Sequence, residues 1–475
     1  MDTTVSSFGA DWAQRGHGLS ALVVGAGLAG SEAAWQLAER GVRVRIVEMR
    51  PDLMTPAHRT AECAELVCSN SLKSLNPSSA AGCLKTELAL LGSFVLRCAL
   101  DARVAAGGAL AVDRARFSRT VTEALMQHPR IELVRAEASD VAELVKNTSV
   151  PCVVATGPLT SDAFAKSLAR LVGRGFLSFY DAAAPIVEAE SLDYRKVFAQ
   201  SRYDKSGADY LNAPFDKEGY ELFWSELVGA ERAISRDFER RELFQACQPV
   251  EEVARAGIDA LRFGALKPVG LRDPATGRRS WAAVQLRAEN SARSAYNLVG
   301  FQTNLTFGAQ ERVFRLIPGL AHAEFVRFGV MHRNTFIDSP HVLGPHFELP
   351  SCPSLFFAGQ ITGTEGYAEA IASGLLAALN VYALIIKAPL VRLPDVSVFG
   401  ALSAYATNPS VEGYQPMHVN YGIMPPLVQR QKSKQQRYES YACRAVTALK
   451  CFVAERSDLC FCAPYALPHV EDATT

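Results

Sequence analysis

The alternation of apolar and polar positions near the N-terminus predicts a strand, a glycine turn, a helix and a second strand. Residues 21–24 are continuously apolar, 28–39 carry small and apolar side chains at helical spacing, and 42–48 alternates Val and Ile with Arg before ending at an acid. An apolar run followed by helical periodicity is typical of a parallel βαβ unit. We therefore expect an α/β fold built on a parallel, Rossmann-type sheet.

The turn between this first strand and helix has the glycine spacing of a dinucleotide-binding loop. Its residues are Gly25, Ala26, Gly27, Leu28, Ala29 and Gly30. Gly25 permits the tight turn, Gly27 lets backbone N–H groups approach a pyrophosphate, and Gly30 lets the helix sit close on the strand. Glu48, at the end of the second strand, would accept hydrogen bonds from ribose hydroxyls. An acid there argues against a 2′-phosphate, which leaves FAD or NAD.

A second strand, glycine turn and helix far along the chain favours FAD. Residues 354–376 read as an apolar strand, a glycine-rich turn with the candidate cofactor-binding residues Gly359, Gln360 and Glu365, and a helix of small residues. Rossmann flavoproteins that bind FAD use such a distal turn for the flavin end of the cofactor, whereas nicotinamide dehydrogenases need none. The Ala-Thr-Gly end of the run 152–157 resembles the same proteins. Three separated segments therefore converge on one FAD.

Composition predicts a cytoplasmic enzyme of at least two domains. A chain of 475 residues with 49% hydrophobic content can bury two or more cores. The first 19 residues lack an apolar run, so we expect no signal peptide and no membrane anchor. The most apolar helix, 370–386, contains Ser373 and Asn380 and suits a buried core. Eleven cysteines without a C-x-x-C pair indicate reduced thiols and no metal site.

Local charge, not net charge, suggests nucleic-acid binding. The chain has 49 basic and 49 acidic residues, yet 262–333 holds eleven Lys or Arg against four acids. Such an excess can form a phosphate-binding face, and aromatic residues within it could stack on unpaired bases. A solvated basic surface around ordinary core aromatics explains the same pattern. The candidate RNA-binding residues are Arg278, Arg279, Arg287 and Arg293, with the aromatic residues Trp281, Tyr296, Phe301 and Phe307.

A cysteine-containing segment soon after the Rossmann acid carries the candidate chemistry. Cys68 lies in Leu-Val-Cys-Ser-Asn-Ser and is the candidate nucleophile. A helix starting near residues 69–71, or a cation from His58, Arg59 or Lys73, would favour its thiolate. A buried structural cysteine is the alternative interpretation.

Several long motifs resemble one family, the bacterial folate- and FAD-dependent tRNA uracil-5-methyltransferases. The resemblance runs from about Leu22 to about Arg444. It is carried by the glycine turn and by segments 48–51, 55–58, 65–71, 107–114, 157–161, 180–187, 261–264, 267–271, 299–303 and 329–337.

The resemblance implies a reaction, its cosubstrates and its partner. Family members transfer the methylene carbon of 5,10-methylenetetrahydrofolate to C5 of the T-loop uridine of tRNA, U54, and use reduced FAD recharged by NAD(P)H to complete the methyl group. By position, Cys68 looks like the thiol that adds to C6 of the uracil and activates C5. No obligate protein partner is evident. A ribosomal-RNA uridine is an alternative substrate.

At one position the chain departs from the family pattern. Where relatives read Tyr-x-Asn-Cys-Pro, this chain has Ala213 in place of a second active-site cysteine that is usually assigned to proton removal. Another group could then deprotonate C5, methylation could be slow or lost, or the residue could be a sequence variant. Cys247 also resembles a family position and could compensate only if the fold brings it close. Cys63, five residues before Cys68, would face elsewhere on a helix.

The predicted architecture is an FAD domain of glutathione-reductase type in two pieces, 20–180 and 325–440, with an inserted α/β domain at 181–324. The inserted domain would carry position 213 and most of the basic patch, with the active site between the domains. Residues 1–19 and 446–475 read as poorly constrained extensions. Two rival classes are a related flavoprotein that modifies the tRNA wobble uridine with a partner GTPase, and a weakly active or non-catalytic flavin-bound RNA-binding protein. The first lacks the Leu-Val-Cys-Ser-Asn-Ser pattern, and only Ala213 suggests the second.

Overall fold

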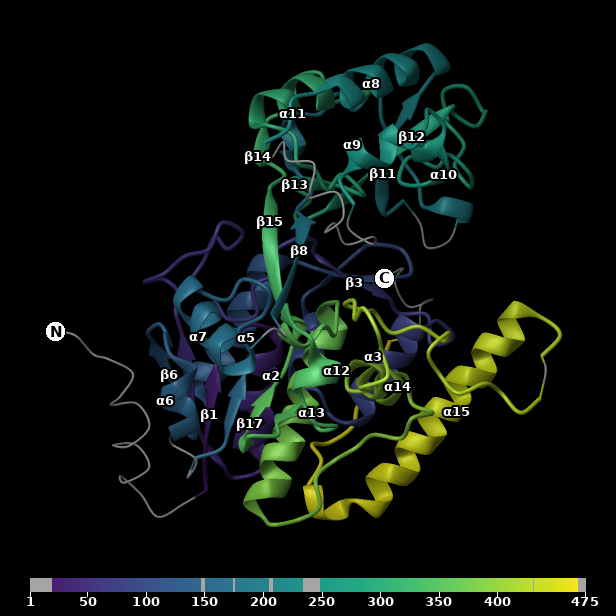
Figure 1. Cartoon of the computed structure of the whole chain (residues 1–475). Coiled ribbons are helices and arrows are strands. Elements are labelled where there is room, and N and C mark those ends of the chain that lie inside the picture. Colours follow the sequence, from purple (N-terminus) through teal and green to yellow (C-terminus); the bar gives the residue numbers. More distant parts are fainter. Residues whose placement is uncertain are drawn as a thin grey trace.

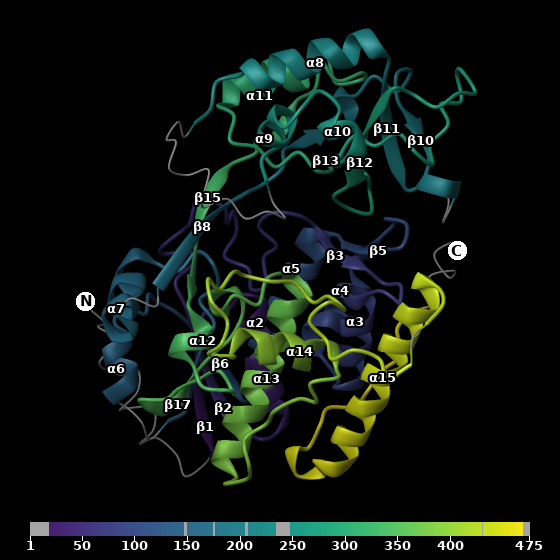
Figure 2. The same ribbon diagram turned by 45° about the vertical axis from the view of Figure 1, so that its right-hand side comes forward.

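The chain folds into two lobes joined by a pair of antiparallel strands. The computed structural model describes residues 19–146, 150–173, 176–204, 208–233, 248–429 and 431–468. Figure 1 shows the larger lobe below and the smaller one above, and Figure 2 shows the same division from another side. The larger lobe is built from both ends of the described chain, so the smaller lobe is an insertion.

A six-stranded sheet forms the centre of the larger lobe. Its strand order is β16-β17-β7-β1-β2-β6, and all neighbours are parallel except β16 and β17. The strands are β1 (Ser20–Val24), β2 (Arg43–Glu48), β6 (Ile131–Arg135), β7 (Cys152–Val154), β16 (Glu348–Leu349) and β17 (Cys352–Phe357). A small sheet of β3 (Ser71–Ser74), β4 (Arg103–Val104) and β5 (Ala109–Val112) lies in the same lobe.

Helices cover this sheet, and two of them place the glycine turns side by side. The helices are α2 (Leu28–Glu39), α3 (Ala80–Leu90), α4 (Phe94–Asp101), α5 (Arg114–Gln127), α6 (Val141–Lys146), α7 (Asp162–Val172), α12 (Ser339–Val342), α13 (Tyr367–Ile385), α14 (Val398–Ala406) and α15 (Lys434–Glu455). Helices α2 and α13 pack closely, because a Cβ at Gly374 would lie 2.1 Å from the carbonyl oxygen of Ala29. Helix α13 is the apolar helix predicted for a buried core, and 83% of its most apolar 18-residue stretch is buried inside the protein.

The inserted lobe is an antiparallel sheet backed by helices. Its strand order is β10-β11-β12-β13-β9-β14. The elements are β9 (Ile186–Glu188), β10 (Phe198–Ala199), β11 (Tyr210–Phe215), α8 (Lys217–Gly229), α9 (Val250–Arg255), α10 (Ala260–Phe263), β12 (Ala282–Ala288), β13 (Ala295–Leu298), α11 (Phe307–Phe314) and β14 (Phe325–Arg327). Leu211, Ala213 and Phe215 of β11 alternate into the core beneath α8. The period of two along a strand puts Asn212 on the opposite face.

The two lobes are connected by β8 (Phe176–Ala182) and β15 (Met331–Ile337), which pair along their whole length. Both views show these strands running from one lobe to the other (Figures 1 and 2). The expected start of the inserted domain, between residues 180 and 181, falls within β8. Its expected end, between residues 324 and 325, falls at the start of β14. A parallel Rossmann sheet with an inserted antiparallel sheet confirms the α/β fold class.

The C-terminal segment differs from the expected loose extension. Helix α15 continues to Glu455, and the chain from Arg456 to Pro468 then folds back on the larger lobe. Arg40 donates from Nε to the carbonyl of Leu459 at 2.8 Å, and the Tyr465 hydroxyl donates to the carbonyl of Ser93 at 2.8 Å. The described part of this segment therefore packs against α2 and the start of α4, in contacts that composition did not reveal.

Candidate functional site

The two glycine turns, more than 300 residues apart in sequence, line one pocket. Gly25, Gly27, Leu28 and Ala29 form one wall, and Gly359, Gln360 and Gly366 form the other. Gly359 has a φ of +83°, and a Cβ there would lie 3.0 Å from that of Ala29. The Ala-Thr-Gly strand end adds Thr156 and Gly157 to the same pocket. All three segments selected from the sequence are thus brought together.

The first turn has the properties that a pyrophosphate requires. Gly27 is the N-cap of α2, and nothing lies within 4 Å of a Cβ built on it. A Cβ on Gly30, by contrast, would lie 1.9 Å from the carbonyl oxygen of Gly25. The first-turn N–H groups of a helix attract an anion, and the open space in front of Gly27 lets one approach. These residues fit the pyrophosphate of FAD.

Glu48 is ionised and held at the edge of this pocket. Its carboxylate accepts from the N–H of Ala26 at 2.7 Å and from Nε of Arg50 at 2.8 Å. Desolvation, the largest single effect, opposes ionisation of Glu48, but the Arg50 guanidinium and the N–H groups of Ala26 and Arg50 together outweigh it, so the pKa of Glu48 lies below its ordinary value. A carboxylate with further lone pairs can still accept from a ribose hydroxyl.

In the second turn, Gln360 donates to the carboxylate of Glu365, and the carbonyl of Glu365 lies 2.6 Å from Nδ1 of His418. Gln360 lines the pocket itself, whereas Glu365 is 7% exposed and braces the turn from behind. The second turn is therefore held by its own Gln360 and Glu365 side chains and by His418.

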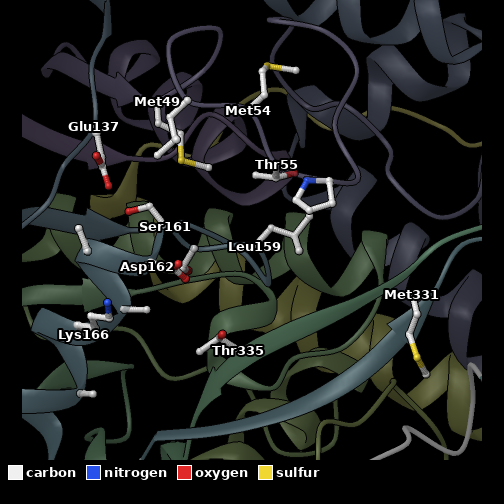
Figure 3. A pocket seen from close by; sticks show the side chains of 16 residues that line it. Met49, Met54, Thr55, Glu137, Leu159, Ser161, Asp162, Lys166, Met331 and Thr335 are labelled. Carbon is white, nitrogen blue, oxygen red and sulfur yellow. The ribbon is translucent and has the colours of Figure 1, made fainter. Parts of the chain in front are cut away.

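A second cavity continues from the Glu48 end of the pocket. The two share Met49 and Leu159. Figure 3 shows side chains from the loop after β2, from the start of α7 and from β15 around this space. In a Rossmann dinucleotide site the adenosine lies at the acid that ends the second strand. This cavity therefore adjoins the end of the site where an adenine would lie.

Cys68 lies on a loop that Tyr367 anchors to the second glycine turn. The Tyr367 oxygen is 3.0 Å from Sγ of Cys68 and accepts from the N–H groups of Cys68 and Ser69 at 3.0 and 3.1 Å. Tyr367 is the first residue of α13 and also lines the pocket between the two glycine turns, which we call the dinucleotide pocket after the ligand that its sequence motif predicts. The chain after Cys68 forms β3 at Ser71–Ser74, so the helix considered for residues 69–71 is absent. The thiol is thus tied to the pocket wall without a helix N-terminus behind it.

Two arginines whose charges act on Cys68 come from distant elements. Arg114, at the start of α5, donates to the carbonyl of Leu66 at 2.7 Å and pairs with Glu289 at 2.6 Å. Arg327, in β14, donates to the carbonyl of Ala57 at 3.3 Å, and its Nε is buried without a hydrogen-bond partner among the described residues. Burial, Arg114 and Arg59 lower the pKa of Arg327, while Cys68 raises it. A thiolate is favoured in such electropositive surroundings.

The cations considered from sequence have other positions. Arg59 and Lys73 are exposed, and His58 lines the dinucleotide pocket with its Nδ1 2.7 Å from the Thr55 hydroxyl.

Arg287 differs from the predicted RNA contact, because it is buried beneath the Cys68 loop. It is 7% exposed and donates to Oδ1 of Asn70 at 2.7 Å and to the hydroxyl of Ser69 at 2.9 Å. Asn70 in turn donates to the carbonyls of Val112 and Ala288, both at 3.0 Å. A guanidinium held in this way positions the loop and cannot meet a phosphate at the surface. We call these contacts of Arg287, Ser69 and Asn70 the loop clamp.

The other three candidate RNA-binding residues, Arg278, Arg279 and Arg293, are exposed. Arg293 lies in the loop from β12 to β13, which begins beside the loop clamp, whereas Arg278 and Arg279 lie in the loop before β12. At about 3.3 Å per residue, the length of β12 separates the two groups by roughly 20 Å. Arg293 therefore lies in the loop at the end of β12 that carries the loop clamp.

Only half of the candidate stacking aromatics are available at the surface. Tyr296 and Phe301 are 5% and 0% exposed and belong to the core of the inserted lobe, which corrects their predicted role. Phe307 is 56% exposed and stacks on Phe328, and Trp281 is 36% exposed with the Arg262 guanidinium 3.8 Å from its ring centre. The accessible aromatic rings already have ring or cation partners within the protein.

Ala213 lies in the core of the inserted lobe. It is 0% exposed and packs with Leu211 and Phe215. A cysteine at this position would point into that core, which argues against a direct catalytic role for the side chain at 213. Cys247, its candidate substitute, lies outside the described residues. Cys63 is fully buried, and desolvation raises the pKa of its thiol to about 11, which keeps it protonated.

Sequence reasoning missed Tyr367, Arg114 and Arg327. Tyr367 directly follows the second glycine turn, and that position next to a flavin-type turn was an available signal. Arg114 and Arg327 carried no such signal, because each reaches Cys68 from another element of the fold.

Comparison with known proteins supports the resemblance found in the sequence. The family model described as glucose inhibited division protein A matches residues 20–388. The methylenetetrahydrofolate–tRNA-(uracil-5-)-methyltransferase of Heliobacterium modesticaldum is 51% identical over 437 residues, which are 92% of this chain and 98% of that protein. The protein of the same name from Acetivibrio thermocellus is 51% identical over 435 residues, 92% of this chain and 99% of its own length.

Among solved structures, GidA of Aquifex aeolicus has the same fold. It superposes with a TM-score of 0.66 at 16% identity, covering 93% of this chain and 75% of the GidA chain. At that identity the likeness concerns the fold alone. The sequence relatives are closer and cover nearly their whole length. The chain therefore belongs to the glucose inhibited division protein A family and, within it, to the methylenetetrahydrofolate–tRNA-(uracil-5-)-methyltransferases.

Proposed function

We propose that this chain methylates C5 of the T-loop uridine of tRNA, U54, with 5,10-methylenetetrahydrofolate as the carbon donor and NAD(P)H as the source of electrons. The observation that carries the proposal is the position of Cys68, which Tyr367 joins directly to the wall of the dinucleotide pocket. A nucleophile beside a cofactor site suits a reaction in which the base and the cofactor must meet. Relatives with half of their residues identical carry the name of this activity.

Cys68 supplies the nucleophilic part of the reaction. Uracil C5 is a poor nucleophile until a group adds to C6, so the thiolate sulfur forms a bond to C6 and the C5–C6 electron pair becomes available at C5. After the carbon is attached, the C5 proton passes to a base or to water, and its electron pair re-forms the C5–C6 double bond. The S–C6 bond breaks in the same elimination, which restores the thiolate. The charges of Arg114 and Arg327 favour the ionised sulfur at both stages.

The pocket between the two glycine turns would hold FAD. The N-terminus of α2 with Gly27 would bind the pyrophosphate, Glu48 the ribose, and the turn around Gly359 the flavin end. When bound, FAD supplies the electrons that complete the methyl group. The residues of the chain bind and orient it and keep Cys68 beside it.

The RNA must present an unstacked uridine to Cys68. An enzyme that acts on a base removes it from its stack, at a cost of a few kcal/mol. Arg293 and the exposed arginines of the loop before β12 would bind the phosphates around it. We further propose that the enzyme works in the cytoplasm, where folate, NAD(P)H and unmodified tRNA are all present.

The test is an anaerobic incubation of the purified holoenzyme with unmodified tRNA, methylenetetrahydrofolate and NADPH, followed by mass spectrometry of the nucleosides for 5-methyluridine. A transcript with cytidine in place of U54 is the matched control and should gain no methyl group. If the methyl group appears in ribosomal RNA and not in tRNA, the substrate is wrong but the chemistry stands. If 5-methyluridine forms in neither RNA, the protein is a flavin-bound RNA-binding protein and the proposal fails.

Cys68→Ser should abolish methylation while FAD is retained, because a hydroxyl has no ionised population comparable to a thiolate near neutral pH. A tRNA with 5-fluorouridine at position 54 should form a denaturant-resistant adduct with the wild type and not with this variant. An adduct that survives the substitution would assign the nucleophile to another residue, with Cys247 the next candidate.

A further inference from the structure

Tyr367 has one oxygen with three hydrogen-bond contacts, and their number determines the direction of the third. The backbone N–H groups of Cys68 and Ser69 both donate to this oxygen, at 3.0 and 3.1 Å. A hydroxyl has one proton to donate and two lone pairs to accept with. Because both lone pairs are used, the oxygen cannot also accept from the Cys68 S–H. The 3.0 Å contact with Sγ is therefore donated by the tyrosine.

We propose that Tyr367 donates a hydrogen bond to the Cys68 thiolate, and so both ionises the nucleophile and holds it at the wall of the dinucleotide pocket. This inference rests on the proposed role of Cys68. A donor to sulfur stabilises the thiolate and not the thiol, because the thiolate is the better acceptor. As sulfur bonds to C6 it loses its negative charge and the hydrogen bond weakens. The proton remains on Tyr367 throughout, and the bond re-forms when the thiolate is released.

The surroundings of Tyr367 suit a permanent donor. The side chain is buried, and desolvation together with the Cys68 charge raises the pKa of its hydroxyl well above the ordinary value. The hydroxyl therefore keeps its proton at any physiological pH. The charged groups that face Cys68 from other elements are Arg114 of α5, whose charge is shared with Glu289, and Arg327 of β14. Arg114 is hydrogen-bonded to Glu289 and to the carbonyl of Leu66, and Arg327 to the carbonyl of Ala57, so removing the hydroxyl of Tyr367 breaks none of these bonds.

The test measures the reactivity of Cys68 as a function of pH in Tyr367→Phe, which keeps the ring and removes only the hydroxyl. Holoenzyme with excess FAD is treated with iodoacetamide, and the modified peptides are quantified by mass spectrometry. The loss of one charge-assisted hydrogen bond should move the half-maximal reactivity of Cys68 upward by about one pH unit, equal to about tenfold less thiolate at neutral pH. The exposed Cys451 is an internal reference and should keep its profile.

Tyr421→Phe is the matched control, because its hydroxyl donates to the carbonyl of Ser78 at 3.1 Å, in the same lobe and without contact to Cys68. It should leave the Cys68 profile unchanged. A second variant guards against loss of flavin or folding. Replacing Tyr367 with 3,5-difluorotyrosine keeps the shape and strengthens the donor, so the midpoint should move downward.

An unchanged Cys68 profile in both Tyr367 variants would overturn the inference. So would equal shifts in Tyr421→Phe, since the effect would then be a general loss of structure. The measurement involves no RNA and no folate. It therefore fails or succeeds independently of the proposed methylation, which the 5-fluorouridine adduct tests.

Discussion

Gly27→Asp should abolish flavin binding without harming the fold. Gly27 is the N-cap of α2 with a φ of −69° and a ψ of −168°, an extended conformation that any residue adopts. No atom lies within 4 Å of the added Cβ. Aspartate is among the best N-cap residues and should leave the stability unchanged or raise it by a few tenths of a kcal/mol. The structure therefore separates folding from cofactor binding at this position.

The cost to flavin binding follows from charge and space. The new side chain would occupy the opening through which a pyrophosphate reaches the N-terminus of α2. A carboxylate about 5 Å from one phosphate charge, at an effective dielectric constant of about 20, is opposed by about 3 kcal/mol. Two such charges give roughly 6 kcal/mol, and even half of this raises the dissociation constant more than 100-fold.

The assay compares the FAD content of the purified proteins, the dissociation constant from flavin fluorescence titration, and the thermal unfolding of the apoproteins. Gly27→Asn is the matched control, because it has the same size and cap but no charge, and it should bind FAD more tightly than the aspartate variant. Gly30→Ala should reduce both stability and FAD content, since its Cβ would lie 1.9 Å from a backbone oxygen. An aspartate variant with stoichiometric FAD and a wild-type dissociation constant would refute the assigned pyrophosphate site.

Four further predictions concern other parts of the chain. Ala213→Cys should change single-turnover methylation by less than about twofold, because the side chain packs in the core of the inserted lobe; a large gain in rate would restore the catalytic interpretation. Arg287→Lys should break the loop clamp, which should lower the free energy of unfolding by about 1.5–3 kcal/mol and slow methylation at unchanged RNA affinity. Arg293→Ala should instead weaken RNA binding, and reduce the salt dependence of that binding, in anisotropy titrations. Desolvation raises the pKa of Glu87 to about 7 from 4.5, so the folded state holds the carboxyl proton more tightly than the unfolded state does. The stability that this proton contributes is fully present below pH 4.5 and is lost as the pH rises through 7. Glu87→Gln should remove this pH dependence of the free energy of unfolding.

Much of the cofactor site could be predicted because it depends on local rules. A strand, a glycine turn and a helix are neighbours in the chain, so Gly25, Gly27 and Gly30 could be assigned their roles from spacing alone. The acid at position 48 and the second turn at 359 followed in the same way. Motif order then identified the family, and relatives of about 50% identity agree.

Burial could not be read in this way, because it depends on which face of an element meets another. Arg287 was counted in a basic patch, yet every residue of β12 is buried and this arginine lies under the Cys68 loop. Ala213 has the same strand parity as Leu211 and Phe215, which was a visible sign that it faces a core.

The sequence alone determined the α/β class, the two glycine turns and the candidate nucleophile, because each is encoded in a short run of neighbouring residues. Only the tertiary structure decided what surrounds Cys68. Tyr367 lies 299 positions from it along the chain, and Arg327 and Arg287 reach its surroundings from the inserted lobe. The energies of such contacts depend on distance in space, and residues far apart in sequence carry no local signal of it. The surroundings of Cys68 are therefore set by the tertiary packing of both lobes.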